Sequence, residues 1–329
     1  MTNCWKALFA VVVAVTQLGL GPVAKQPRRI VILMDGIGGR IQPQEQGLRD
    51  GLEELGYSEG SDIVFTRLTA VGYDRLRSMM ISHMRRETID LVIALGTTEA
   101  AVAMGVSRTI PTVFLPVADP VGSGFVKSFA KPQTNLTGLS FLTGPENIGK
   151  QLEVFRQVVP SLRRVTVLID GREGSRSNSR LPQKFAAVAS RLAIKLTKRS
   201  VATIGDATQA VANLHGPPDH HGVFVFCSGL FKNLKAVAAA AITQRMPLFG
   251  CNAFQVAEQD VLLSYAPDLY SLGYRGAWFV DRIFKGAQPH DLPVETPRKF
   301  ELVINTKVAE QYGLKIPNDV LRLADRIFD

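Results

Sequence analysis

The chain has 329 residues, of which 46% are hydrophobic and 20% are charged, and it contains three cysteines. This composition is too apolar for a disordered chain, and three cysteines form neither a disulfide scaffold nor a multi-cysteine zinc site. Chains of this length usually divide their core, so we expect two lobes of about 130 to 160 residues each. The formal net charge is +9. Because no arginine- or lysine-rich tail accompanies it, we interpret the excess as solvated basic surface and expect no nucleic acid partner.

The first 24 residues predict a signal peptide rather than a part of the fold. Residues 1–6 carry one positive charge, and residues 7–20 are apolar apart from two positions. Small residues follow, and we expect cleavage at Gly21 or Ala24. The apolar run is shorter than the roughly 20 residues of a membrane span, so an uncleaved anchor is the alternative. In either case the globular part is exported, which predicts a periplasmic or secreted protein.

From residue 29 onward, short apolar runs alternate with amphipathic stretches. The runs predict strands, and the stretches between them predict helices. In the first half we expect strands at 30–34, 63–68, 91–95, 111–115 and 136–139, and helices at 44–55, 73–86 and 97–106. After Gly144 we expect strands at 165–169, 223–226, 248–250 and 301–305, and helices at 148–159, 183–194, 207–214, 234–245, 268–284 and 319–328.

This alternation predicts the α/β class, with two lobes that each contain a doubly wound parallel sheet, joined by a multi-strand hinge. We assign residues 29–143 and 266–290 to the first lobe, and residues 144–265 and 291–329 to the second. The hinge is expected in the connections at 138–144, 262–266 and 292–297.

Several motifs for catalysis or cofactor binding are missing from the sequence. It has no phosphate-binding loop, no Gly-x-Ser-x-Gly nucleophile motif and no His-Glu-x-x-His. The glycines after the first strand lack the third glycine of a dinucleotide loop, because position 41 is Ile41. His215, Asp219, His220 and His221 cluster in a loop, and we favour solvated side chains over a metal site. The sequence therefore predicts a protein that is not an enzyme and has neither a cofactor nor a metal.

Two further features leave alternatives open. Cys227 and Cys251 end two predicted strands, and we favour two buried thiols over a disulfide, although an exported protein would permit the bond. Ten basic residues and two acidic ones lie between Arg163 and Arg199. We interpret this block as a solvated helix face, with a docking surface or an anionic membrane contact as the alternative.

Most of the candidate binding residues lie where the predicted strands end. In open α/β sheets, ligands bind outside the carboxyl ends of the strands. Here these ends supply hydroxyls, amides and separated carboxylates, without a pair of nucleophile and base. The candidate ligand-binding residues are Asp35, Gly36, Gly96, Thr97, Thr98, Asp119, Thr137, Ser228, Asn252 and Asp268. Such a set suits holding a polar, zwitterionic small molecule in an interlobe cleft that closes on it. For Asp119 the alternative is a helix cap.

Short motifs spread over residues 29 to 329 carry a family resemblance. They are GLRDGL at 47–52, LGYSEG at 55–60, YDRL at 73–76, IPTVF at 110–114, DPVGSGFV at 119–126, NLTGLS at 135–140, SYAPD at 264–268, DRIFKGA at 281–287, DLPVE at 291–295 and KFELVIN at 299–305. Together they resemble the ABC transporter substrate-binding proteins of the tryptophan/tyrosine-binding type, which have the type I periplasmic-binding fold. The resemblance implies a monomer that binds an amino-acid-like or aromatic small-molecule ligand and delivers it to an ABC transporter permease.

The chain departs from the family pattern at two places near the expected edge of the second lobe. Glu258–Val261 replaces the usual Glu-Ala-Gly-Gly, and the segment 172–179 is rich in arginine and serine. Two other functions stay open at this point. One is a ligand-sensing module that reports to a membrane receptor without transport, and the other is an enzyme on the same fold.

Overall fold

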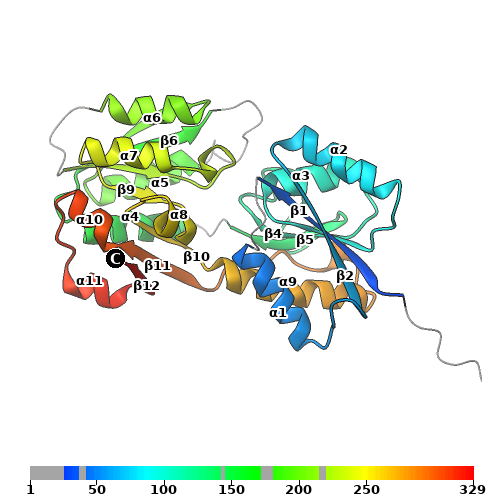
Figure 1. Ribbon diagram of the computed structural model, residues 1–329. Helices are drawn as coiled ribbons and strands as arrows, with labels where there is room; N and C mark the ends of the chain where they lie inside the picture. Colours follow the sequence, from blue (N-terminus) through cyan, green and yellow to red (C-terminus); the bar gives the residue numbers. More distant parts are fainter. Residues whose placement is uncertain (1–25, 37–41, 142–144, 172–180, 215–219) are drawn as a thin grey trace, which may run out of the picture.

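The computed structural model describes residues 26–36, 42–141, 145–171, 181–214 and 220–329. Their strands form two separate sheets, one in each of two α/β lobes (Figure 1). The predicted signal peptide lies outside the described residues, as do His215 and Asp219 of the histidine cluster and the arginine-rich segment 172–179. Among the described residues, none of the helices combines the length and the apolar character that a membrane span requires.

The first lobe is built on a five-stranded sheet with the order β2-β1-β3-β4-β5, in which every neighbouring pair is parallel. Its strands are β1 (Arg28–Asp35), β2 (Ile63–Ala70), β3 (Leu91–Ala94), β4 (Thr112–Val117) and β5 (Leu136–Ser140). The helices are α1 (Pro43–Glu54), α2 (Tyr73–Met84), α3 (Thr97–Val106) and α9 (Leu269–Phe284). Both faces of the sheet are covered, which explains why its strands read as continuous apolar runs.

Successive residues of β1 show how the two faces are divided. Ile30 and Ile32 share a core with apolar residues of α1 and α9, whereas Val31 and Leu33 pack with residues of α2 and α3. Alternate side chains of a strand point to opposite faces, so this single apolar run supplies two cores. Figure 1 shows α1 and α9 on one side of the sheet and α2 and α3 on the other.

The second lobe is built on a seven-stranded sheet with the order β12-β11-β10-β9-β8-β6-β7. Its strands are β6 (Arg164–Asp170), β7 (Lys195–Val201), β8 (His221–Val225), β9 (Leu248–Gly250), β10 (Leu263–Pro267), β11 (Phe300–Asn305) and β12 (Arg326–Phe328). All neighbouring pairs are parallel except β10 and β11. The helices are α4 (Pro145–Val158), α5 (Leu181–Arg191), α6 (Ile204–Ala212), α7 (Lys235–Thr243), α8 (Ala253–Glu258), α10 (Thr306–Gln311) and α11 (Asn318–Leu323). One core joins α4, α5, α10 and α11 to the sheet, and the other joins α6, α7 and α8.

The predicted fold class, two α/β lobes with parallel sheets, is confirmed, but several elements of the second lobe differ from expectation. The helix predicted at 319–328 ends at Leu323, and residues 326–328 form β12, which pairs with β11. The basic block was expected on a helix face, yet Lys195, Lys198 and Arg199 lie on the edge strand β7 and are exposed. Charged residues on an edge strand discourage pairing with other chains, which accounts for a strand without an apolar pattern.

The connections between the lobes are linked to one another by hydrogen bonds. Strand β10 belongs to the second sheet and α9 to the first lobe, so the chain crosses at Asp268. Asp268 N donates to Lys299 O at 3.1 Å, and Ser140 N donates to Glu295 O at 2.8 Å. Leu292 and Val294 pack in cores of the first lobe. The chain therefore leaves this lobe a few residues later than the predicted boundary after residue 290.

Candidate ligand-binding site

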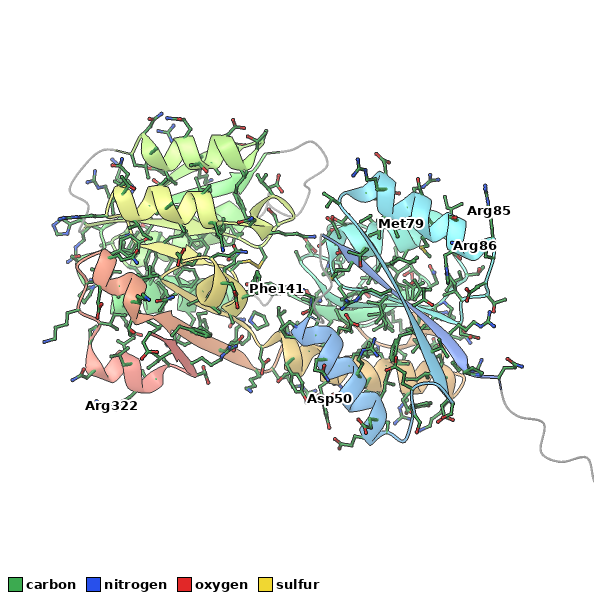
Figure 2. The ribbon with its side chains drawn as sticks, in the orientation of Figure 1. Asp50, Met79, Arg85, Arg86, Phe141 and Arg322 are labelled. Atoms are coloured by element: carbon green, nitrogen blue, oxygen red, sulfur yellow. A yellow bond between two sulfur atoms is a disulfide. The ribbon has the colours of Figure 1, made fainter. Side chains whose placement is uncertain are left out.

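The loops at the carboxyl ends of the two sheets meet at Lys232, which follows β8 in the short helix η3 (Leu230–Lys232). Its ammonium Nζ lies 3.1 Å from Oδ2 of Asp35, the last residue of β1. Phe141, directly after β5, lies between the two lobes in Figure 2. The candidate site is therefore built from strand ends of both lobes.

On the side of the first lobe, the ends of β1 and β3 hold two carboxylates together. The backbone N–H of Asp35 donates to Oε1 of Glu99 at 2.6 Å, and Oδ1 of Asp35 accepts from Gly72 N at 2.8 Å. The Glu99 side chain is 3% exposed. Burial raises the pKa of Glu99, while the positive charge of Lys232 and the N–H of Asp35 oppose that rise. The predicted residue Gly96 makes room for this carboxylate, because an added Cβ would lie 2.6 Å from Oε2 of Glu99.

Glu99 was not among the residues predicted for the site. It lies in the first turn of the alanine-rich helix α3, two residues after Thr97, and a carboxylate on such a helix was the available signal. The neighbouring predicted residues have smaller roles in the structure. Gly36 N donates to Ala70 O at 3.0 Å. Thr97 Oγ1 accepts a long hydrogen bond from Ala118 N at 3.4 Å, and Thr98 is half-buried.

Asp119 follows β4 and stabilises a turn. Its Oδ1 accepts from Gly122 N at 2.8 Å, and its carbonyl accepts from Ser123 N at 2.9 Å. The chain at this point forms a hydrogen-bonded turn and no α-helix, so the expected cap is a turn cap. Oδ2 of Asp119 makes no hydrogen bond to the described residues, and Val121 of the same turn is 39% exposed.

Two of the predicted binding residues have contacts that fix the fold. Thr137 is fully buried, and its hydroxyl donates to Leu292 O at 2.7 Å. Asp268 caps α9 by accepting from Ser271 N and Oγ at 3.3 and 2.7 Å, and it forms an ion pair with Lys299 at 2.9 Å. Burial alone would raise the pKa of Asp268, but the hydrogen bonds from Lys299 and Ser271 outweigh burial and lower it. Both residues are therefore occupied within the protein.

On the side of the second lobe, a disulfide joins the ends of β8 and β9. Cys227 and Cys251 are bonded with a Cα–Cα distance of 5.2 Å. The preference for two free thiols was therefore wrong, because the parallel pairing of β8 and β9 brings the two loops next to each other. The predicted residues Ser228 and Asn252 each follow one of these cysteines.

The loops beside the disulfide carry polar and aromatic groups. Asn252 caps α8 by accepting from Gln255 N at 3.1 Å. Ser228 Oγ is buried and has no hydrogen-bond partner among the described residues. Phe254, in the first turn of α8, is 47% exposed. An unpaired hydroxyl and an exposed aromatic ring are groups that a bound ligand can satisfy.

Two histidines of the loop cluster lie within the described residues, and both are bonded within the second lobe. The expectation of solvated side chains was wrong for His221, which is 6% exposed. His221 Nε2 lies 2.9 Å from Thr166 Oγ1, and His220 Nδ1 lies 2.9 Å from Ser161 O. Burial, helped by the nearby charge of Arg164, lowers the pKa of His221. No group of three metal-ligating side chains occurs in the part of the chain that the structure describes.

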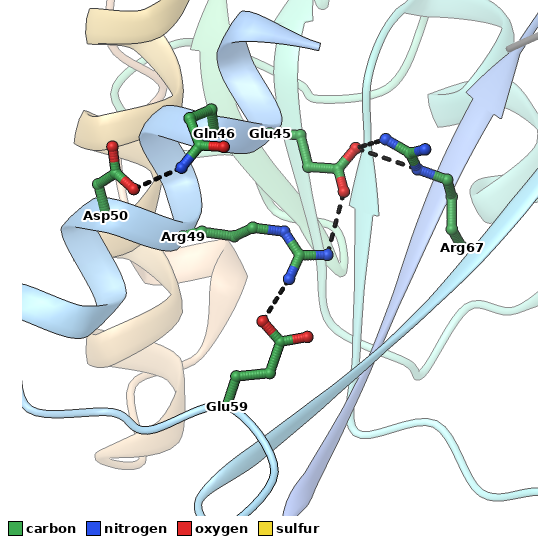
Figure 3. Close-up of polar contacts among 6 residues, drawn as sticks. All are labelled: Glu45, Gln46, Arg49, Asp50, Glu59 and Arg67. Atoms are coloured by element: carbon green, nitrogen blue, oxygen red, sulfur yellow. Dashed lines mark hydrogen bonds and ion pairs between the residues drawn. The ribbon is translucent and has the colours of Figure 1, made fainter. Parts of the chain in front are cut away.

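The family motifs near the N-terminus hold α1 in place, as Figure 3 shows. Glu45 is 1% exposed and accepts hydrogen bonds from Arg67 Nε and Arg49 Nη2, each at 3.1 Å. Arg49 also pairs with Glu59 and stacks over the Phe65 ring at 4.3 Å from its centroid. The motifs at 47–52 and 55–60 therefore carry the fold of the first lobe rather than the binding site.

Two α/β lobes whose strand ends meet between them form the type I periplasmic-binding fold. The family model for the ABC transporter substrate binding protein matches residues 38–328. The chain belongs to this family.

Comparisons with individual proteins agree with this assignment. The tyrosine-binding protein of Clostridioides difficile is 25% identical over 267 residues, which cover 80% of this chain and 75% of that protein. A conserved domain protein of Vibrio cholerae has a solved structure with a TM-score of 0.80 and 27% identity, covering 92% of this chain and 100% of that one. The solved structure of an ABC domain of Streptococcus pneumoniae in complex with L-Trp has a TM-score of 0.78 and 22% identity. The match covers 92% of this chain and 100% of that one. The resemblance stated from the sequence is confirmed.

Proposed function

We propose that the chain is an exported solute-binding protein that captures an amino-acid-like or aromatic molecule between its lobes and delivers it to an ABC permease. In this proposal it acts as a monomer in the periplasm or outside the cell, after removal of its signal peptide, and without a cofactor or catalysis. The observation that carries it is the meeting of strand ends from both lobes, with polar and aromatic groups on each side. The tyrosine-binding relative supports the choice of ligand class.

In this proposal the two ends of a zwitterion are held by different lobes. Oδ2 of Asp119 is available to accept from a ligand ammonium, a charge-assisted contact of about 1.5 to 3 kcal/mol. On the second lobe, Ser228 Oγ, which has no partner among the described residues, and the Asn252 side chain can donate to a ligand carboxylate. Phe254, exposed beside Asn252, offers a ring to an aromatic ligand. Because neither lobe supplies both ends, binding favours the conformation in which both touch the ligand.

A thermal-shift screen of amino acids against the mature protein, followed by calorimetry, tests this proposal. The variant Asp119→Asn retains an oxygen that accepts from Gly122 N but loses the charge. We expect it to weaken affinity by about tenfold or more while the melting temperature stays close to that of the wild type. The control is Asp291→Asn, because Asp291 is 71% exposed and, among the described residues, its carboxylate pairs with the neighbouring His290 alone.

A larger loss of stability than of affinity in Asp119→Asn would show that Asp119 serves the turn alone. Transport is tested separately by measuring uptake of the identified ligand in cells that lack this protein or its permease. Unchanged uptake in both strains would favour the sensing module.

A further inference from the structure

One cation of the second lobe reaches into the first. Lys232 Nζ lies 3.1 Å from Oδ2 of Asp35 and 3.9 Å from Oε1 of Glu99, and it also donates to the carbonyl oxygen of Asp35. These acceptors form what we call the ammonium cradle, defined by Asp35 and Glu99. Two other ion pairs lie at the chain crossings, Lys299 with Asp268 and Arg275 with Glu295, and the remaining pairs cited for the described residues lie within one lobe.

The ammonium cradle is held in place without Lys232. Gly72 N and Asp35 N each fix one carboxylate, at 2.8 and 2.6 Å, and Glu99 is almost completely buried. Gly96 leaves the space that the Glu99 carboxylate occupies. Two carboxylates and a carbonyl fixed around one point match the three donors of a primary ammonium.

The backbone at Lys232 is held in place on the second lobe by two buried glutamines. Gln259 Nε2 donates to Lys232 O at 2.9 Å, and Gln259 Oε1 accepts from Leu234 N at 2.7 Å. Gln255 Nε2 donates to Phe231 O at 2.7 Å, and both glutamines are almost fully buried. Because the backbone at Lys232 is held by these bonds, the contact mainly requires ordering of the Lys232 side chain, which lowers its entropic cost.

We propose that Lys232 is a latch that holds the two lobes together in the ligand-free protein by placing its ammonium in the cradle of Asp35 and Glu99. The latch also shapes specificity, because a ligand ammonium meets a cradle that the protein's own cation fills and is received by Asp119 instead. Only this second consequence rests on the proposed function. The Glu258–Val261 departure from the family pattern includes Gln259, whose amide holds the Lys232 backbone carbonyl.

Small-angle scattering on the mature, ligand-free chain tests the latch directly. We expect Lys232→Gln to have a larger radius of gyration than the wild type at low salt. Because salt screens a partly exposed ion pair, high salt is expected to raise the radius of gyration of the wild type toward that of the variant. Lys232→Arg keeps the charge and is expected to stay compact. The matched control is Lys235→Gln, because Lys235 is exposed nearby on α7 and forms no ion pair with the described residues.

Equal radii for Lys232→Gln and the wild type at low salt, in protein whose circular dichroism and melting temperature show that it is folded, would overturn the proposal. Swelling of Lys235→Gln to the same extent would also overturn it, because the effect would then be one of general charge. No ligand takes part in this measurement. A failure to find a ligand would thus refute the proposed function, whereas equal radii would refute the latch.

Discussion

The packing of α1 against α9 offers a sharp test of the first lobe. At Gly273 an added Cβ would lie 1.8 Å from Gln44 O and 2.6 Å from Gln44 C, both in the backbone of the facing segment. Ordinary contact begins near 3.4 Å, so Gly273→Ala forces the helices apart by about 1.6 Å. The displaced interface includes Leu48, Leu52 and Leu272, all in one core.

We expect Gly273→Ala to lower the free energy of unfolding by about 2 to 3 kcal/mol, since overpacking costs about 1 to 3 kcal/mol and more when the obstacle is backbone. At about 2 to 4 °C per kcal/mol, the melting temperature falls by roughly 5 to 10 °C. Urea unfolding is followed by the fluorescence of Trp278, which lies on α9 and is the single tryptophan after residue 24.

The control for this experiment is Gly205→Ala on α6. There the added Cβ meets only Thr203 Oγ1 at 3.5 Å, so alanine is expected to stabilise the helix by about 0.5 to 1 kcal/mol. A Gly273→Ala variant that unfolds at the urea concentration of the wild type would refute the argument that close backbone approach holds α1 against α9.

Three further predictions concern the disulfide and two carboxylates. Replacing Cys227 and Cys251 by serine should destabilise the protein by about 3 kcal/mol, given the 24-residue separation, and intact mass before and after reduction checks the bond. The pKa of Asp268 is lowered in the folded state, so its pairing with Lys299 stabilises the protein above the usual aspartate range and this stabilisation decreases as the pH falls below it. Urea unfolding of Asp268→Asn should therefore show its full deficit at pH 7 and a smaller one at pH 3. The pKa of Glu99 is raised in the folded state, so the stability that its protonated form contributes is lost as the pH rises. Glu99→Gln should therefore gain stability relative to the wild type between pH 4 and pH 8. A difference in the free energy of unfolding that stays constant over this range would contradict the raised pKa.

The amino-acid sequence by itself determined the two sets of strands and helices and the fold class. Buried strands such as β1 and β3 are continuous apolar runs because both their faces are covered. Helices such as α1 and α9 show one apolar face and are followed within two residues by Gly56 and Gly286, which have positive φ. These signals come from residues that are close together in the chain, so they can be recognised in a single sequence. β7 and β12 lack them, because β7 is exposed along most of its length and β12 has three residues.

The contacts that build the site were decided only by the tertiary structure. Asp35 and Lys232 are 197 positions apart, and no local pattern indicates that one would meet the other. Thr137 and Asp268 were candidates from the sequence, yet Thr137 is buried in the sheet and Asp268 caps α9 and pairs with Lys299. The disulfide depended on which strands became neighbours. Periodicity in the sequence indicates whether a residue is buried. The partner that the residue contacts depends on the spatial order of the strands in each sheet and on how the lobes are placed.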